Sequence, residues 1–115
     1  MNTIKIANMI NFNFNKEENT LICELQGRMG ADNALELSVP IQKELDVHLV
    51  KNENKSSLKV QFNMQDVSYI ASSFIRICIT IAKQLDEGNF SMTKTSPMIK
   101  KTMKIAGLDE ILNVS

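Results

Sequence analysis

The sequence predicts an α/β fold of α+β-like character, in which helices cover one face of a mixed sheet of four to five strands. Two observations carry this prediction. Four segments alternate apolar and polar residues, which is the pattern of strands with one dry and one wet face. Three segments with helical periodicity follow the second, third and fourth strands, giving the order β-β-α-β-α-β-α plus a short terminal element. Strands connected through helices favour right-handed crossovers within one sheet.

The first two strands are predicted at residues 4–14 and 21–25. The polar segment 15–19 between them is typical of a turn, so the two strands should form a hairpin. The third strand, 58–64, alternates most regularly, and a short fourth strand is expected at 90–93. The alternating apolar residues of the first three strands are Ile4, Ile6, Ile10, Phe12, Phe14, Leu21, Cys23, Leu25, Leu58, Val60, Phe62 and Met64.

The first helix is predicted from about residue 32 to residue 51. Its buried stripe repeats at steps of four and consists of Leu37, Ile41, Leu45 and Leu49. Pro40 cannot lie in an undisturbed helix interior. Either the helix is kinked there, or Ser38 caps a helix whose regular part begins at about Val39.

The second helix is predicted at 72–87 and has more apolar surface than one core needs. Its core face is expected to comprise Phe74, Ile77, Cys78, Ile81 and Leu85, and its polar stripe Arg76, Thr80, Lys83, Gln84 and Glu87. Ile75, Ile79 and Ala82 form a second apolar flank. Either neighbouring helices of the same domain cover this flank, or it is a surface for a partner.

The third helix has clear boundary residues. Ser96 is a good N-cap, Pro97 suits the first helical position, and Gly107 suits the left-handed position after the last turn. Its expected buried residues are Ile99, Met103 and Ala106. Residues 108–112 should then close the chain as a short helix or an edge strand.

Length and charge limit the function. The chain has 115 residues, which fits one domain spanning 1–115, and 13 basic residues balance 13 acidic ones. A general nucleic-acid binder needs a basic surplus, so none is expected. There is no run of about 20 apolar residues and no signal-peptide pattern at the N-terminus. We therefore expect a cytoplasmic protein without a membrane span.

The sequence offers little catalytic chemistry. It has no phosphate-binding loop, no dinucleotide fingerprint and no nucleophile elbow. Cys23 and Cys78 lack close cysteine partners and are expected to be reduced core residues, and His48 alone cannot build a zinc site. We therefore expect no catalytic residues, no metal, no cofactor and no enzyme.

One polar site remains, the pair Ser72 and Ser73 at the start of the second helix. One of the two serines could simply be the N-cap. A phosphate at the same place would face free backbone N–H groups and the positive end of the helix dipole. It would also put about two negative charges beside the apolar flank and repel a partner docked there.

Five segments together resemble the STAS domain of bacterial anti-sigma factor antagonists. They are LQG at 25–27, VSYIASS at 67–73, LDEG at 85–88, SPMI at 96–99 and AGLDEIL at 106–112. The resemblance covers nearly the whole chain and implies the STAS fold. It differs from the family pattern at Ala71, where an acidic or polar residue often stands, and at Phe74, where glycine is common. Gly30 replaces the usual acidic residue after the second strand, with Asp32 two positions later.

The resemblance implies a function in partner switching that regulates transcription. The unphosphorylated antagonist would bind an anti-sigma factor that is also a serine kinase of the histidine-kinase-like ATPase fold. Phosphorylation would release it, and a serine phosphatase would reset it. The phosphoacceptor falls on Ser72, with Ser73 as the second choice, and the implied partner-binding residues are Ala71, Ser73, Phe74, Ile75, Arg76 and Ile79.

Two further hypotheses remain open. The chain could be a constitutive STAS scaffold, a subunit of a larger signalling or lipid-transport assembly without a phosphoswitch. It could also sense a small molecule, although no phosphate loop or cofactor motif supports this.

Overall fold

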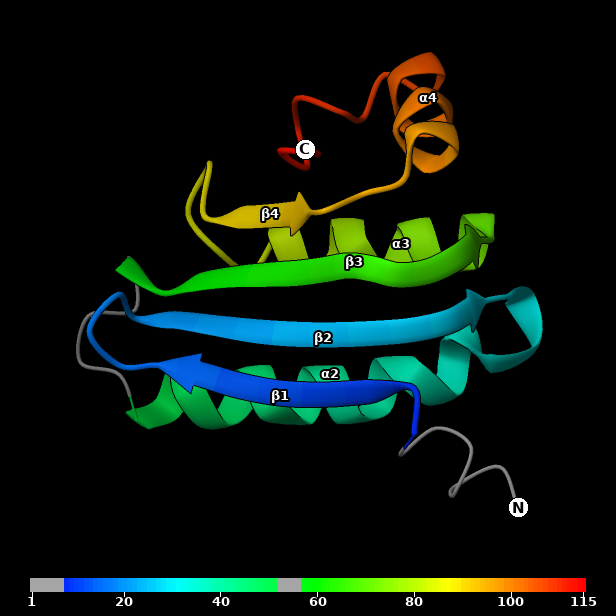
Figure 1. The fold of residues 1–115 in the computed structure, drawn as a ribbon. Coiled ribbons are helices and arrows are strands. Elements are labelled where there is room, and N and C mark those ends of the chain that lie inside the picture. The colour runs from blue at the N-terminus through cyan, green and yellow to red at the C-terminus, as the bar shows by residue number, and fades with distance from the viewer. Residues whose placement is uncertain (1–7, 52–56) are drawn as a thin grey trace.

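The computed structural model describes residues 8–51 and 57–115. The chain order is β1 (Ile10–Asn15), β2 (Thr20–Met29), α2 (Ala31–Lys51), β3 (Lys59–Ile70), α3 (Ser72–Ala82), β4 (Phe90–Thr93) and α4 (Pro97–Ile105) (Figure 1). The strands form one sheet in the order β1-β2-β3-β4, with β1 antiparallel and the other three parallel to their neighbours. Helices α2 and α3 lie behind this sheet in Figure 1, so the predicted fold class is confirmed.

The predicted hairpin is confirmed for its described part. Phe12 pairs with Cys23 and Phe14 with Leu21, so the apolar side chains of both strands share the face covered by α2. Asn19 completes the turn with a positive φ of 51°, a conformation that asparagine tolerates better than most residues. The expected strand residues Ile4 and Ile6 lie outside the described residues.

Strand β3 is longer than the alternation predicted, because two irregularities interrupt its register with β2. Asn63 pairs with Glu24 and Asp66 with Gln26, and further on Val67 pairs with Gly27 and Tyr69 with Arg28, so β3 carries one extra residue at each place. The first, a β-bulge, shifts the buried positions from Met64 to Val67, an interval of three. A period-two pattern therefore stops at residue 64, whereas the strand continues to Ile70.

The core lies between the sheet and helices α2 and α3. The Phe62 ring contacts two other rings at its centre, with centroids 4.9 Å from Phe90 and 6.1 Å from Phe74. Cys23 and Cys78 are free and buried, as predicted, and burial raises the pKa of both thiols. Raised pKa values keep these thiols protonated and unreactive in the folded protein.

Helix α2 runs through Pro40, which decides between the two alternatives for this proline. The helix is continuous from Ala31 to Lys51, so it does not restart at Val39. The Ser38 hydroxyl donates to the carbonyl of Leu35 at 2.6 Å instead of capping a new helix. The buried stripe contains Leu37, Ile41 and Leu45 as predicted, and Leu49 is half-buried.

Helix α3 is shorter than predicted. It ends at Ala82, and the N–H groups of Gln84 and Leu85 donate to carbonyls three residues back, which tightens the chain into turns. Gly88 follows with a φ of +86°. Of the expected core face, Phe74, Cys78 and Ile81 are buried, whereas Ile77 and Leu85 are half-buried.

The boundaries of α4 are confirmed, but one of its expected core residues is not. The Ser96 hydroxyl accepts from the N–H of Ile99 at 3.3 Å, and Gly107 has a φ of +74°. Ala106 is exposed; it is the C-cap residue that follows the last helical residue, Ile105.

The C-terminal residues form turns, ending in an isolated parallel bridge between Met92 and Val114. Residues 108–112 therefore form neither the expected short helix nor the expected edge strand, although the bridge lies beside β4 and Leu112 is buried. Among the described residues, no helix is both long and apolar enough to cross a membrane.

Candidate phosphorylation site at the start of α3

The start of α3 lies at the edge of the sheet where the parallel strands β2 and β3 end. Both strands lead directly into helices there, so the N-termini of α2 and α3 share this edge (Figure 1). The N–H of Ala71 donates to the carbonyl of Met29 at 2.8 Å and ties the two junctions together. Two helix N-termini at one edge favour negative charge.

The residue that caps α3 is Ala71, so the expected serine N-cap is wrong. Ala71 has extended backbone angles, and its carbonyl accepts from the N–H groups of Phe74 and Ile75 at 3.0 and 3.2 Å. Its hydrogen bond to Met29 continues the sheet, which sets the start of the helix at the next residue. Ser72 is therefore the first helical residue, and it is exposed.

The Ser72 hydroxyl has no hydrogen-bond partner within the part of the chain that the structure describes. An exposed hydroxyl with no capping contact is chemically available for transfer of a phosphoryl group. The first N–H groups of a helix lack partners within the helix, so they could receive hydrogen bonds from phosphate oxygens.

Ser73 differs from its neighbour. Its hydroxyl oxygen is buried and has no hydrogen-bond partner among the described residues. The side chain lines a groove of about 390 Å³ between α2 and α3, together with Leu35, Arg76 and Ile77. A buried hydroxyl is less accessible to a kinase, so the geometry favours Ser72 over Ser73.

The predicted partner-binding residues divide by burial. Phe74 is fully buried against Phe62 and Ala71 is nearly so, which leaves their side chains little surface for a partner, and their role in binding stays a prediction. The Phe74 ring points into the core, so its size does not obstruct Ser72. Arg76 is exposed, whereas Ile75 and Ile79 are half-buried, and their contact with a partner stays a prediction.

The second apolar flank of α3 is covered in part by the C-terminal turns. Ile79 and Ala82 line a cavity of about 190 Å³ together with Ile111 and Leu112. Ile75, Ile79 and Ala82 all pack partly against the core. The surplus apolar surface is therefore smaller than the sequence alone indicated.

The structure adds one polar side chain that sequence reasoning missed at this edge. Asn33 is buried, and its side-chain amide donates to the carbonyl of Arg28 at 3.1 Å. Its Oδ1 is buried and accepts no hydrogen bond from the described residues. Nothing in the sequence indicated that Asn33, in the first turn of α2, would point into the domain.

An exposed pair lies on the strand ends at the same edge. The Arg28 guanidinium lies 4.3 Å from the centre of the Tyr69 ring, and Arg28 and Tyr69 are paired across β2 and β3. This is the geometry of a cation–π contact. Tyr69 lies beyond the β3 bulge, in the part of the strand that the alternation did not reveal.

The histidine and cysteines do not form a metal site in the described part of the chain, where no group of three potential ligands occurs. His48 stacks on Phe14 with ring centroids 4.1 Å apart, and its Nε2 lies 4.0 Å from a Glu44 carboxylate oxygen. The histidine therefore has a packing role between α2 and β1.

Replacing the two helix-start serines by alanine should have different effects. Ser96→Ala removes a capping hydrogen bond and should lower the free energy of unfolding by about 1 kcal/mol. Ser72→Ala removes no such contact and should change it by less than about 0.5 kcal/mol. Urea unfolding of both variants measures this difference, and an equal loss would show that Ser72 does cap α3.

The fold and the site define a class, namely small α/β domains with a mixed sheet and an exposed serine opening the helix after the third strand. The family model of the STAS domain matches residues 11–115, and the chain belongs to this family.

Known proteins resemble this chain in sequence or in fold. Over 102 residues the chain is 26% identical to the candidate anti-sigma factor antagonist BtrV of Bordetella bronchiseptica, covering 87% of this chain and 81% of BtrV. The structure of the anti-sigma factor antagonist SpoIIAA in its unphosphorylated form matches with a TM-score of 0.58 at 10% identity, over 84% of this chain and 82% of that one. The NMR structure of TM1081 matches with a TM-score of 0.67 at 18% identity, over 93% and 80%. These two structures confirm the fold.

Proposed function

We propose that this chain is an anti-sigma factor antagonist that works by partner switching. In its unphosphorylated form it binds an anti-sigma factor that is also a serine kinase of the histidine-kinase-like ATPase fold. Transfer of the ATP γ-phosphoryl group to the Ser72 oxygen, with loss of the hydroxyl proton, ends the interaction and leaves ADP. A serine phosphatase then restores the hydroxyl by hydrolysis.

The observation that carries this proposal is the state of Ser72. It is the first residue of α3, it is exposed, and it does not cap the helix. A phosphate placed there gains from the helix dipole and from free N–H groups, so the fold accommodates the modification.

The surroundings of Ser72 explain how a phosphate would end binding. Arg76 is exposed one helical turn further on, and the half-buried Ile75 lies between them in the sequence. A partner docked over this surface would have to bury the phosphate, and desolvation of two negative charges disfavours that complex. The relatives support the same function, since BtrV and SpoIIAA are both named as anti-sigma factor antagonists.

Intact-mass measurement after incubation with the candidate kinase and ATP tests the proposal. The kinase to be tested is a serine kinase of the histidine-kinase-like ATPase fold from the same organism. One added phosphate is expected on the unmodified chain and on Ser73→Ala, and none on Ser72→Ala.

Two outcomes would count against the proposal in different ways. A phosphate that persists in Ser72→Ala and disappears in Ser73→Ala would move the acceptor to Ser73. Complex formation without any added phosphate would overturn the switch and favour a constitutive STAS scaffold.

A further inference from the structure

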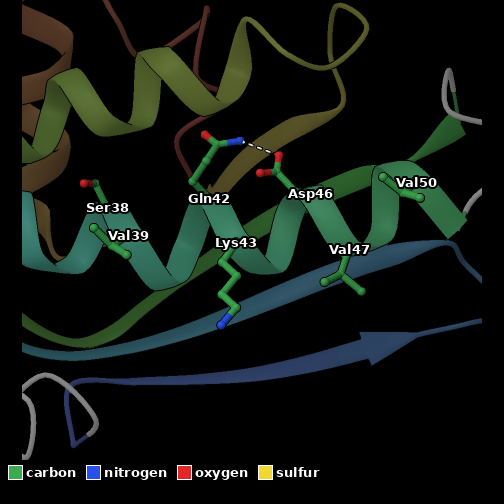
Figure 2. A pocket seen from close by; sticks show the side chains of 7 residues that line it. All are labelled: Ser38, Val39, Gln42, Lys43, Asp46, Val47 and Val50. Carbon is green, nitrogen blue, oxygen red and sulfur yellow. Dashed lines mark hydrogen bonds between the residues drawn. The ribbon is translucent and has the colours of Figure 1, made fainter.

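Helix α2 carries a second apolar stripe that faces away from the core. The α2 stripe comprises Leu35, Val39, Val47 and Val50, whose side chains are 79%, 65%, 38% and 81% exposed. These four are half of the eight large apolar side chains that are exposed among the described residues. The last three line a shallow depression of about 720 Å³ on this face, together with Gln42, Lys43 and Asp46 (Figure 2).

Apolar and polar side chains alternate along this face of α2. Leu35, Val39 and Val50 lie along one face, with the polar Gln42 and Asp46 between them at steps of three or four, and Val47 lies at the border of that face. The core stripe of Leu37, Ile41 and Leu45 uses the opposite side of the same helix. A helix that is apolar on two sides needs cover on both.

The polar residues within the stripe are ordered by contacts inside the domain. Gln42 donates to an Asp46 carboxylate oxygen at 2.9 Å, which Figure 2 shows, and exchanges side-chain hydrogen bonds of 2.8 Å with Gln84 of α3. These contacts fix Gln42 and Asp46 before any partner arrives, which lowers the entropy cost of docking.

We propose that the α2 stripe binds the α2 stripe of a second copy of this chain, with the two helices antiparallel about a twofold axis. Lys43 lies four residues after Val39, and Asp46 lies four residues before Val50. An antiparallel register that places Lys43 opposite the partner's Asp46 therefore places Val39 opposite the partner's Val50. The twofold axis repeats both contacts, so Lys43, Asp46, Val39 and Val50 of each copy all have a complement, whereas Val47 lies opposite the partner's Gln42.

The charge of the stripe favours a second copy over a charged surface. Between positions 38 and 50, the residues lining the depression include one lysine and one aspartate. Because these two charges cancel, the face has no net attraction for an anionic membrane or a polyanion. The lysine of one copy can, however, pair with the aspartate of a second copy. The contact uses few side chains per copy, so the dimer is expected to be weak, with a dissociation constant in the micromolar range.

Sedimentation equilibrium of the full chain across a concentration series tests the dimer. The unmodified chain should show a monomer–dimer equilibrium, and Val50→Asp should raise its dissociation constant at least ~10-fold. The matched control is Ile105→Asp on α4, which is equally exposed and should leave the equilibrium unchanged.

A charge reversal separates self-association from other roles of this face. Lys43→Glu and Asp46→Lys should each weaken the dimer, because each brings like charges together across the axis. The double variant Lys43→Glu/Asp46→Lys should restore it. Thermal unfolding of every variant checks that the domain remains folded.

Three outcomes would overturn the proposal. The first is a monomer at all concentrations up to about 1 mM, and the second is a double variant that stays as weak as the single ones. The third is a monomer in which Val50→Asp abolishes binding of the candidate kinase, which would assign the stripe to a different partner. The proposed phosphoswitch at Ser72 is tested independently of the dimer, because it is measured as an added phosphate and not as a dissociation constant.

Discussion

Ser72→Asp is expected to weaken binding of the candidate kinase by at least ~100-fold, because like charge or a desolvated carboxylate in an interface costs several kcal/mol. The aspartate would lie at the exposed start of α3, beside the surface that includes Arg76 and Ile75. Folding should not suffer, since a carboxylate in the first turn of a helix is favourable by about 0.3–1 kcal/mol. Isothermal titration of the variant against the kinase measures the loss directly.

Ser72→Asn is the matched control for this experiment. Asparagine has the size of aspartate without its charge, so this variant should keep most of the affinity. If both variants lost binding equally, bulk and not charge would be responsible. If neither lost it, Ser72 would lie outside the interface, and the constitutive scaffold would be favoured.

Phe62→Ala is expected to have the largest effect on stability. Phe62 is fully buried at the centre of the core, and its ring contacts those of Phe74 and Phe90. Loss of a buried phenylalanine side chain typically lowers the free energy of unfolding by about 3–5 kcal/mol. That is a large part of the total for a domain of this size. Urea unfolding monitored by circular dichroism measures the change.

Phe14→Ala provides the comparison. This ring is half-buried and stacks on His48 at the side of the sheet, so its loss should cost clearly less than that of Phe62. Equal losses would show that the core does not depend on the three-ring cluster.

The regular parts of the fold could be predicted from the sequence because local patterns determine them. The hairpin, β4 and the ends of α4 follow from alternation, turn residues and caps that act within a few positions. The extension of β3 to Ile70 could not be predicted, because the bulge beside Gln65 breaks the alternation. The early end of α3 was also missed, since Leu85 continues the helical spacing although the chain has already turned.

The candidate site was predictable only in part. The position of Ser72 followed from the resemblance and from the break between strand and helix. The cap was misassigned, because a serine is the better capping residue and only the sheet contact from Ala71 to Met29 selects alanine. The inward Asn33 and the Arg28–Tyr69 contact depend on which strands are neighbours, and this information is absent from local spacing.

The attachment of α3 through the backbone of Ala71 has a consequence for the lifetime of the protein in the cell. The Ser72 hydroxyl makes no contact that the fold needs. A phosphate ester can therefore form on this hydroxyl and be hydrolysed again without loosening the domain. Both forms should then resist proteolysis equally, because degradation follows the population of opened molecules. The signal would therefore change how many copies are engaged with a partner, while the total number of copies would remain constant.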